Sequence, residues 1–187
     1  MKIIILGKGY VGNHLFKKLS EHSGRYGERP NVQIYSKDEL DYTDNYSLLQ
    51  EINVMEDTYV INCSGFTGRP NVDEGENKKE ECWKYNVEVP LNLNKACNEL
   101  GAQIIHITSG CIYTGYEKEW EEDDTPNFGI YSNESSFYSK SKHAFETLSD
   151  TGLHLRIRMP FCDTLHERSV LTKIYNYDNI VNAVNSK

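Results

Sequence analysis

Three side chains have the types and spacing needed to protonate a carbonyl oxygen. Tyr138 and Lys142 are four residues apart, so on a helix they share one face. A free phenol has a pKa near ~10, and a neighbouring ammonium stabilises the phenolate and lowers that pKa. Tyr138 could then donate a proton to the oxygen while hydride reaches the carbon, and Ser109, after a buried strand, could hydrogen-bond the same oxygen. A YxxxK spacing alone is common on solvated helix faces, so the interpretation depends on what accompanies it.

A glycine-rich loop, GKGYVG from Gly7 to Gly12, accompanies it near the N-terminus. Gly7 would allow a tight turn off the preceding strand, Gly9 a close backbone approach to a pyrophosphate, and Gly12 close packing of helix and sheet. The helix N-terminus would offer free N–H groups to the phosphates. We therefore predict a dinucleotide site, the alternative being a glycine-rich turn without a ligand. The other residues of this loop assigned to the site are Lys8, Tyr10 and Val11.

The end of the second predicted strand bears on which dinucleotide is bound. An acidic residue there would hold the ribose hydroxyls of NAD. This chain has Ser36 and Lys37 instead, and a hydroxyl and a cation suit a 2′-phosphate. The sequence therefore favours NADP(H), while NAD stays open and Lys37 could equally be an exposed loop lysine.

Strands and helices alternate along the chain, which predicts the scaffold for these residues. The predicted strands are 2–6, 32–35, 58–63, 102–108 and 153–159. The predicted helices are 10–21, 46–52, 73–100 with an interruption near 85–90, and 136–150. Residues 110–135 form a long loop whose acidic block, Glu121 to Asp124, should face solvent. This alternation predicts an α/β fold, a Rossmann-type doubly wound parallel sheet.

Composition narrows the classes of partner. The chain has 187 residues and a net charge of -8, so its charge gives no help in binding nucleic acid or anionic membranes. No apolar run approaches the ~20 residues of a membrane span. The five cysteines form no CxxC pair and the histidines show no ligand spacing, so we expect a cytoplasmic protein without a metal site. A homodimer is left open.

These residues resemble the extended short-chain dehydrogenase/reductase family. Within it, several segments resemble the nucleotide-rhamnose epimerase-reductases, and the likeness runs from residue 3 to nearly the last residue. The most specific segments are TGRPNVD (67–73) and DTPNF (124–128), and the others are SGCIY, FYSKSK, LRIRMP and LTKI. This family converts UDP-4-keto-6-deoxy-glucose to UDP-L-rhamnose with NADPH. Related families are the dTDP-4-dehydrorhamnose reductases and the GDP-fucose synthases.

The resemblance implies an epimerisation pair, Cys111 and Lys173. In a 4-keto sugar, C3 and C5 both flank the ketone, so their protons are acidic. A thiolate could remove each proton if the pKa of Cys111 falls below its free value of ~8.5, and an ammonium could return one. Which residue is base and which is acid stays open. Without the resemblance, Cys111 would be a small buried apolar residue and Lys173 a surface cation.

The resemblance also implies further binding residues. Cofactor contacts would come from the loop after the third strand, from the segment bordering the adenine and from a supporting asparagine: Cys63, Ser64, Gly65, Asp41, Tyr42 and Asn86. The sugar-nucleotide site would include Thr67, Arg69, Asn71, Ser109 and Gly110. For Arg69 and Asn71 the alternative is a capped turn before a helix, with Asp73 as the N-cap.

Two features depart from the family. The loop spacing is GxGxxG rather than GxxGxxG, which should still bind a pyrophosphate. Relatives also continue well beyond Lys187, so we expect a dinucleotide-binding domain at 1–160 and only the truncated start of a substrate-binding portion at 161–187. A dTDP or GDP sugar, or a non-catalytic dinucleotide-binding subunit, are therefore alternatives to the UDP-sugar enzyme.

Overall fold

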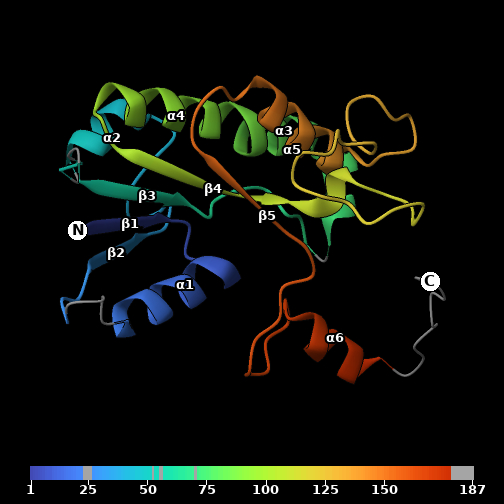
Figure 1. The fold of residues 1–187 in the computed structure, drawn as a ribbon, viewed down its shortest axis with the longest axis horizontal. Coiled ribbons are helices and arrows are strands. Elements are labelled where there is room, and N and C mark those ends of the chain that lie inside the picture. The colour runs from blue at the N-terminus through green and yellow to red at the C-terminus, as the bar shows by residue number, and fades with distance from the viewer. Residues whose placement is uncertain (23–26, 52, 55–56, 70, 178–187) are drawn as a thin grey trace.

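A computed structural model describes residues 1–22, 27–51, 53–54, 57–69 and 71–177. Five parallel strands form one sheet in the order β2-β1-β3-β4-β5 (Figure 1). The strands are β1 (Lys2–Leu6), β2 (Asn31–Tyr35), β3 (Thr58–Asn62), β4 (Gln103–Ser109) and β5 (Leu153–Ile157). The predicted doubly wound parallel sheet is confirmed. Because the strands are parallel, their carboxyl ends lie at one edge, where the predicted site residues follow β1, β3 and β4.

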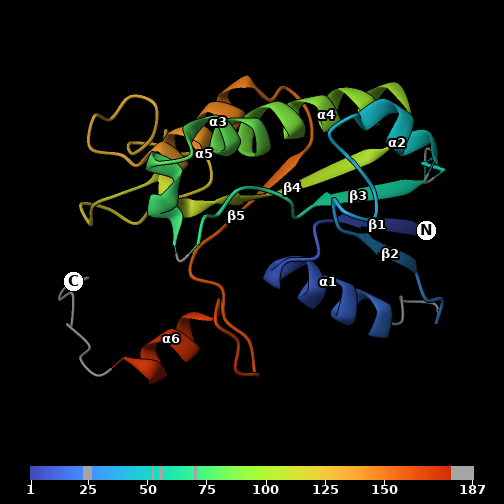
Figure 2. The same ribbon diagram turned by 180° about the vertical axis from the view of Figure 1, so that it is seen from behind.

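Helices cover both faces of the sheet (Figures 1 and 2). They are α1 (Tyr10–Glu21), α2 (Asn45–Glu51), α3 (Lys79–Trp83), α4 (Val89–Glu99), α5 (Phe137–Leu148) and α6 (Val170–Asn176). Both views show α1 on one face and α2 to α5 on the other. The bounds predicted for α1 are confirmed to the residue.

Alternate residues of β1 bury against different helices. Ile4 and Leu6 belong to a cluster with Leu93 of α4, whereas Ile3 and Ile5 belong to a second cluster with Leu15 of α1. Successive side chains of a strand point to opposite faces, so this continuous apolar run serves both layers at once. The run therefore suits β1 to an interior position in the sheet, between β2 and β3, with the glycine loop at its end.

The long helical region after β3 differs from its prediction. It begins as a 3-10 helix, Val72–Glu76, and Asn71 rather than Asp73 is the N-cap, its side chain accepting the Asp73 N–H at 2.9 Å. The interruption predicted near 85–90 takes the form of a π-helical turn, Lys84–Glu88, which separates α3 from α4 while the chain stays helical. Pro90, in the first turn of α4, has no N–H to donate to the carbonyl four residues earlier, which fits the wider turn.

The chain after β5 crosses to the α1 side of the sheet, and α6 lies apart from the helices on the other face (Figures 1 and 2). The contacts that dock this segment include one ring contact and one hydrogen bond. The His166 and Tyr10 rings lie 4.5 Å apart, and Arg168 donates to the Gly68 carbonyl at 3.0 Å. The predicted domain boundary at 160 stays a prediction, and its last residues, 178–187, lie outside the described chain. No helix within the described ranges is long and apolar enough to cross a membrane.

Candidate active site

The glycine loop has two positions that packing restricts to glycine and one that it leaves open. A Cβ added at Gly12 would lie 1.9 Å from the Gly7 carbonyl oxygen, and one at Gly7, whose φ is 108°, would lie 2.8 Å from the Ser64 nitrogen. A Cβ at Gly9 would meet nothing within 4 Å. Gly9 is also the N-cap of α1, and no side chain caps that helix end. The loop therefore leaves free N–H groups and open space where a pyrophosphate was predicted.

The loop after β3 runs beside the glycine loop. Cys63 donates its N–H to the Leu6 carbonyl at 2.8 Å, and Ser64 donates both its N–H and its hydroxyl to the Asn62 side chain, at 3.0 and 2.5 Å. Burial raises the pKa of Cys63 to about 12, so its thiol is a packing group at neutral pH. This loop and the glycine loop thus form one continuous edge.

Two residues predicted to bind the cofactor, Lys8 and Ser36, both contact Glu39, a residue that the sequence did not single out. Glu39 accepts the Ser36 N–H at 2.9 Å and the Ser36 hydroxyl at 3.2 Å, and its other oxygen pairs with Lys8 at 2.5 Å. Hydrogen bonds from Lys8 and then Ser36 lower the pKa of the Glu39 carboxyl. The signal was available in the SxxE spacing, which resembles a capping box.

Lys37 lies over the ring of Tyr85, its Nζ 5.2 Å from the ring centroid. Lys84 lies over the same ring at 5.7 Å. Asp41 is next to this cluster and accepts from the Thr43 N–H at 2.9 Å, while Tyr42 is buried. The charges of Lys84 and Lys37 help to lower the pKa of Asp41, after the larger effect of its hydrogen bonds with Thr43. Two cations thus gather next to the predicted adenine segment.

Tyr138 of α5 lies beside Ser109, at the end of β4, and Lys142 Nζ lies 5.9 Å from the centroid of the Tyr138 ring. Both side chains are buried, each with 7% of its surface exposed. Burial raises the pKa of Tyr138 to about 12, opposed by a hydrogen bond with Ser109, and burial lowers the pKa of Lys142 to about 8. The sequence predicts a lower pKa for Tyr138 from a neighbouring ammonium, whereas in the structure burial dominates and raises that pKa. Tyr138 is a protonated phenol at neutral pH and so is fit to donate a proton.

Asn86, in the π-helical turn, ties the loop after β3 to α5. Its oxygen accepts the Phe66 N–H at 2.9 Å, and its nitrogen donates to the Ser141 hydroxyl at 3.0 Å. A Cβ at Gly65 would lie 3.0 Å from Asn86 Oδ1 and 3.2 Å from Lys142 Nζ. The absence of a side chain at Gly65 thus lets the Lys142 ammonium approach the loop, and Asn86 supports that arrangement.

Of the predicted epimerisation pair, only Cys111 lies in this group. It belongs to a short 3-10 turn, Gly110–Ile112, where its N–H donates to Ser109 Oγ at 3.2 Å, and its thiol lies close enough to Tyr138 to affect the Tyr138 pKa. Lys173 lies on α6, apart from β4 and α5 (Figures 1 and 2). The structure does not bring Lys173 to Cys111, so their joint role stays a prediction.

The TGRPNVD motif divides into structural and accessible residues. Gly68 has a φ of 64°, and a Cβ there would lie 2.2 Å from the Asn71 carbonyl oxygen. Asn71 acts as a helix cap, which favours the capped-turn interpretation for that residue. Thr67 and Arg69 are exposed and available to a ligand. Pro70 lies outside the described residues.

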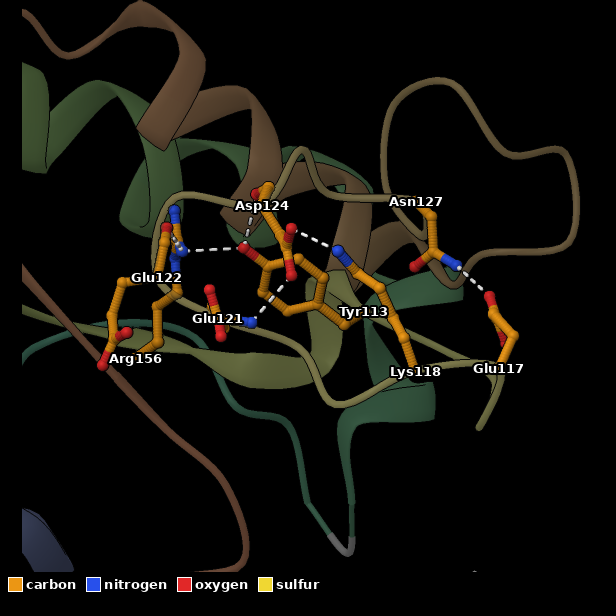
Figure 3. A network of polar contacts seen from close by, with 8 residues as sticks. All are labelled: Tyr113, Glu117, Lys118, Glu121, Glu122, Asp124, Asn127 and Arg156. Atoms are coloured by element: carbon orange, nitrogen blue, oxygen red, sulfur yellow. Dashed lines mark hydrogen bonds and ion pairs between the residues drawn. The ribbon is translucent and has the colours of Figure 1, made fainter.

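Arg156 of β5 holds the long loop after Cys111 in place (Figure 3). Its guanidinium donates to the Tyr113 hydroxyl at 2.7 Å and to the Glu122 carbonyl at 2.8 Å, and it pairs with Glu146 of α5 at 2.8 Å. The acidic block is exposed at Glu121, Glu122 and Asp123, as predicted, whereas Asp124 is half-buried and pairs with Lys118. The loop is therefore a folded part of the wall next to Cys111.

No group of three or more His, Cys, Asp or Glu residues in the described part of the chain could hold a metal ion. The chemistry available to the group is thus that of a phenol, a hydroxyl, an ammonium and a thiol at the carboxyl edge of a parallel sheet. With a dinucleotide on the glycine loop, this set suits hydride transfer to the carbon of a carbonyl group, or from the carbon of the corresponding alcohol.

Comparisons with known proteins agree with this geometry. Residues 1–159 match the family described as RmlD substrate binding domain. The whole chain is 37% identical to 28% of a trifunctional UDP-glucose 4,6-dehydratase/UDP-4-keto-6-deoxy-D-glucose 3,5-epimerase/UDP-4-keto-L-rhamnose-reductase of Arabidopsis thaliana. A crystal structure of a UDP-rhamnose synthase from Acanthamoeba polyphaga mimivirus matches with a TM-score of 0.76 and 29% identity, over 96% of this chain and 63% of that one.

A dTDP-4-dehydrorhamnose reductase of Bacillus anthracis, solved in complex with NADP, shares the fold with a TM-score of 0.57 and 23% identity, over 83% of this chain and 52% of that one. The chain thus spans less than two thirds of the length of each of these proteins.

Proposed function

Because the chain belongs to the RmlD substrate binding domain family, within the extended short-chain dehydrogenase/reductases, we propose that it is an NADPH-dependent reductase of a nucleotide 4-keto-6-deoxy sugar. One observation carries the proposal: Ser109, Tyr138 and Lys142 converge beside the loop that follows β3, at the sheet edge that also holds the glycine loop. A binding protein without catalysis has no need of a buried phenol and ammonium at that place.

The chain's own residues fit a nicotinamide dinucleotide. The open space at Gly9 and the uncapped end of α1 suit the pyrophosphate, and the Lys142 ammonium, which approaches the loop at Gly65, would bind the ribose of the nicotinamide. NADPH would supply the hydride. Tyr138 would donate its proton to the C4 oxygen, Ser109 would hold that oxygen, and Lys142 would stabilise the phenolate left behind.

NADPH rather than NADH is supported by the charges near Tyr85. Lys37 and Lys84 place two ammonium groups over its ring, where a 2′-phosphate could pair with both. Glu39 works in the other direction, since a free carboxylate would repel that phosphate. Its engagement by Lys8 and Ser36 offsets this negative charge.

For the epimerase activity, the support is the position of Cys111. Its thiol lies near Tyr138 and therefore near the carbons that flank the C4 ketone. Lys173 would have to approach by movement of α6, or another residue would supply the second proton. The UDP-linked sugar is supported by the names of the Arabidopsis and viral relatives. A cytoplasmic location and a homodimer remain proposals, and the five free cysteines are compatible with the first.

The test is to mix the protein with NADPH and UDP-4-keto-6-deoxy-glucose in deuterated water and to follow NADPH absorbance and product mass. We expect NADPH oxidation and product with deuterium at C3 and C5. Oxidation without deuterium would leave the reductase and remove the epimerase. Absence of oxidation with both the UDP and the dTDP sugar would remove the reductase. Cys111→Ser serves as the matched variant, since it should lose deuterium uptake without losing NADPH binding.

A further inference from the structure

A histidine lies in the middle of the apolar strand β4 and takes no part in the proposed reaction. His106 is 1% exposed, and it connects the side chains of two buried asparagines. Its Nδ1 lies 3.1 Å from Asn62 Nδ2, and its Nε2 lies 2.6 Å from Asn94 Oδ1. Asn62 continues to Ser64, and Asn94 continues to Thr151. A chain of polar contacts therefore crosses the core from the loop after β3 to the turn before β5.

Backbone groups at the two ends determine the direction of every hydrogen bond in this chain. The Ser64 N–H can only donate, so the Asn62 atom that it meets at 3.0 Å is the oxygen, and the Asn62 nitrogen must face His106. The Thr151 carbonyl can only accept, so the Asn94 nitrogen faces it at 3.2 Å and the Asn94 oxygen faces His106.

These two constraints leave one state for the imidazole. Nδ1 faces a donor, so it must carry no hydrogen and accept from Asn62. Nε2 faces an acceptor, so it must carry the hydrogen and donate to Asn94. His106 is therefore neutral, with its proton on Nε2. Burial lowers the pKa of His106 to about 3, with smaller effects from His154 and Lys142, which agrees with a neutral ring at neutral pH.

The direction of these hydrogen bonds also determines whether the Ser64 hydroxyl can donate a hydrogen bond to a ligand or accept one from it. Asn62 Oδ1 accepts the Ser64 hydroxyl hydrogen at 2.5 Å, so that hydrogen is not available to another acceptor. The Tyr42 hydroxyl also hydrogen-bonds Ser64, which opposes the rise that burial causes in the pKa of Tyr42. Because the Ser64 hydrogen goes to Asn62, Tyr42 donates to one lone pair of Ser64 Oγ, and the other lone pair can accept a hydrogen bond from a ligand hydroxyl. Ser64 is adjacent to Gly7, where a Cβ would lie 2.8 Å from the Ser64 nitrogen, so this acceptor lies at the edge of the glycine loop.

We propose that His106 is a positioning residue for the dinucleotide: through Asn62 it orients Ser64 so that the Ser64 hydroxyl accepts a hydrogen bond from a ribose hydroxyl of the cofactor. The inference rests on the proposed dinucleotide site and adds a residue to it that touches no ligand. Without His106, the Asn62 amide group could rotate, and Ser64 would then face the amide nitrogen, a donor, in place of the amide oxygen, an acceptor.

The first test is the state of the ring in the wild-type protein. Nitrogen-15 NMR of histidine-labelled protein at neutral pH should show, for His106, a Nδ1 without hydrogen and a Nε2 with one. Assignment comes from the signals lost in His106→Gln. A proton on Nδ1, or a charged ring, would overturn the proposed direction of the chain without any measurement of activity.

The second test is NADPH affinity by calorimetry in three variants. His106→Phe removes both hydrogen bonds of the ring. We expect NADPH to bind about 5- to 30-fold more weakly, because a misaligned Ser64 would lose the equivalent of one or two hydrogen bonds to the cofactor. Gln can donate and accept in the same directions, so His106→Gln should bind more tightly than His106→Phe. His154→Phe is the matched control: the His154 ring packs against that of His106, with ring centroids 5.8 Å apart, but its Nε2 meets the Ser149 hydroxyl and not Asn62, so this variant should bind like the wild type.

At saturating NADPH, His106→Phe should keep the wild-type kcat while KM for NADPH rises, because the ring does not touch the reacting atoms. Wild-type affinity in a folded His106→Phe protein, checked by circular dichroism, would overturn the positioning role alone. Failure of the wild type to bind NADPH would overturn the proposed function as well.

Discussion

Lys142 shows at the scale of one residue how burial and function conflict. Its ammonium is needed near Tyr138, yet burial lowers its pKa from 10.5 to about 8. The native state therefore binds fewer protons than the unfolded chain between these two pH values, and the free energy of unfolding should rise as pH increases from about 8 toward 10.5.

Lys142→Met should remove that pH dependence, because methionine fills similar space without a charge. Urea unfolding at pH 7 and pH 10 measures it: we expect the variant to be more stable than the wild type at pH 7, by about 1–3 kcal/mol, and to differ less at pH 10. Equal slopes with pH in both proteins would show that Lys142 keeps its ordinary pKa.

Individual residues also show which parts of the site could be predicted from the sequence. Tyr138, Lys142 and Ser109 could be predicted, because a periodic spacing and a strand end place them together. The SxxE spacing signals that Glu39 contacts Ser36, but not that it pairs with Lys8, 31 residues away in sequence. His106 could not be assigned a role, because its partner Asn62 lies 44 residues away in sequence. A polar residue within the apolar run of β4 was the available signal, since buried polar groups are hydrogen-bonded.

Among the elements, α1 was predictable to the residue because its glycines and apolar period mark its start and its inner face. The helical region after β3 was not. Its π-helical turn depends on Pro90 and on the contacts that Asn86 makes with Phe66 and Ser141, which are tertiary. The place of Lys173 also depends on how the chain leaves β5, and the spacing of residues does not specify that path.

The start of α1 gives a matched pair of glycine variants. Gly12→Ala would force a Cβ to 1.9 Å from the Gly7 carbonyl oxygen, so α1 must move from the sheet and stability should fall by more than about 1 kcal/mol. Gly9→Ala meets no atom within 4 Å and should stay within about 0.5 kcal/mol of the wild type.

NADPH affinity distinguishes the roles of these two glycines. Gly9→Ala should bind NADPH at least about 10-fold more weakly despite its normal stability, because the methyl group fills the space meant for phosphate. Denaturant unfolding and calorimetry on both variants provide the comparison. Normal affinity in Gly9→Ala would argue against a pyrophosphate at this helix end.

The long loop after Cys111 depends on Arg156. Removing the guanidinium leaves the Glu146 carboxylate, 6% exposed, without its partner, so Arg156→Met should destabilise the protein by about 2–4 kcal/mol. Limited proteolysis should then cut within 114–128 sooner than in the wild type. The double variant Arg156→Met/Glu146→Leu should recover part of the stability, and no recovery would mean that the ion pair is not the source of the loss.

At the scale of the whole molecule, the parallel sheet brings the carboxyl ends of β1, β3 and β4 to one edge. The alternation of strands and helices in the sequence predicts this arrangement. Which dinucleotide binds at that edge depends on side chains that come from separate loops. Because ligand binding to the native state stabilises the whole fold, NADPH at 100 times its Kd should add about 2.7 kcal/mol.

Thermal unfolding therefore compares the cofactors. NADPH should raise Tm more than NADH at equal concentration. Lys37→Ala and Lys84→Ala should reduce the NADPH effect and leave the NADH effect unchanged, since only NADPH carries the 2′-phosphate. A larger shift with NADH in the wild type would assign the site to NAD.

The reductase claim is tested most directly by NADPH that carries deuterium at C4 of the nicotinamide, mixed in a single turnover with UDP-4-keto-6-deoxy-glucose. We expect deuterium to appear at C4 of the sugar, and we expect Tyr138→Phe to bind NADPH normally but to transfer the deuterium about 10²- to 10⁴-fold more slowly. A Tyr138→Phe protein that transfers deuterium at the wild-type rate would contradict the role given to this phenol, and no transfer by the wild type would contradict the reductase itself.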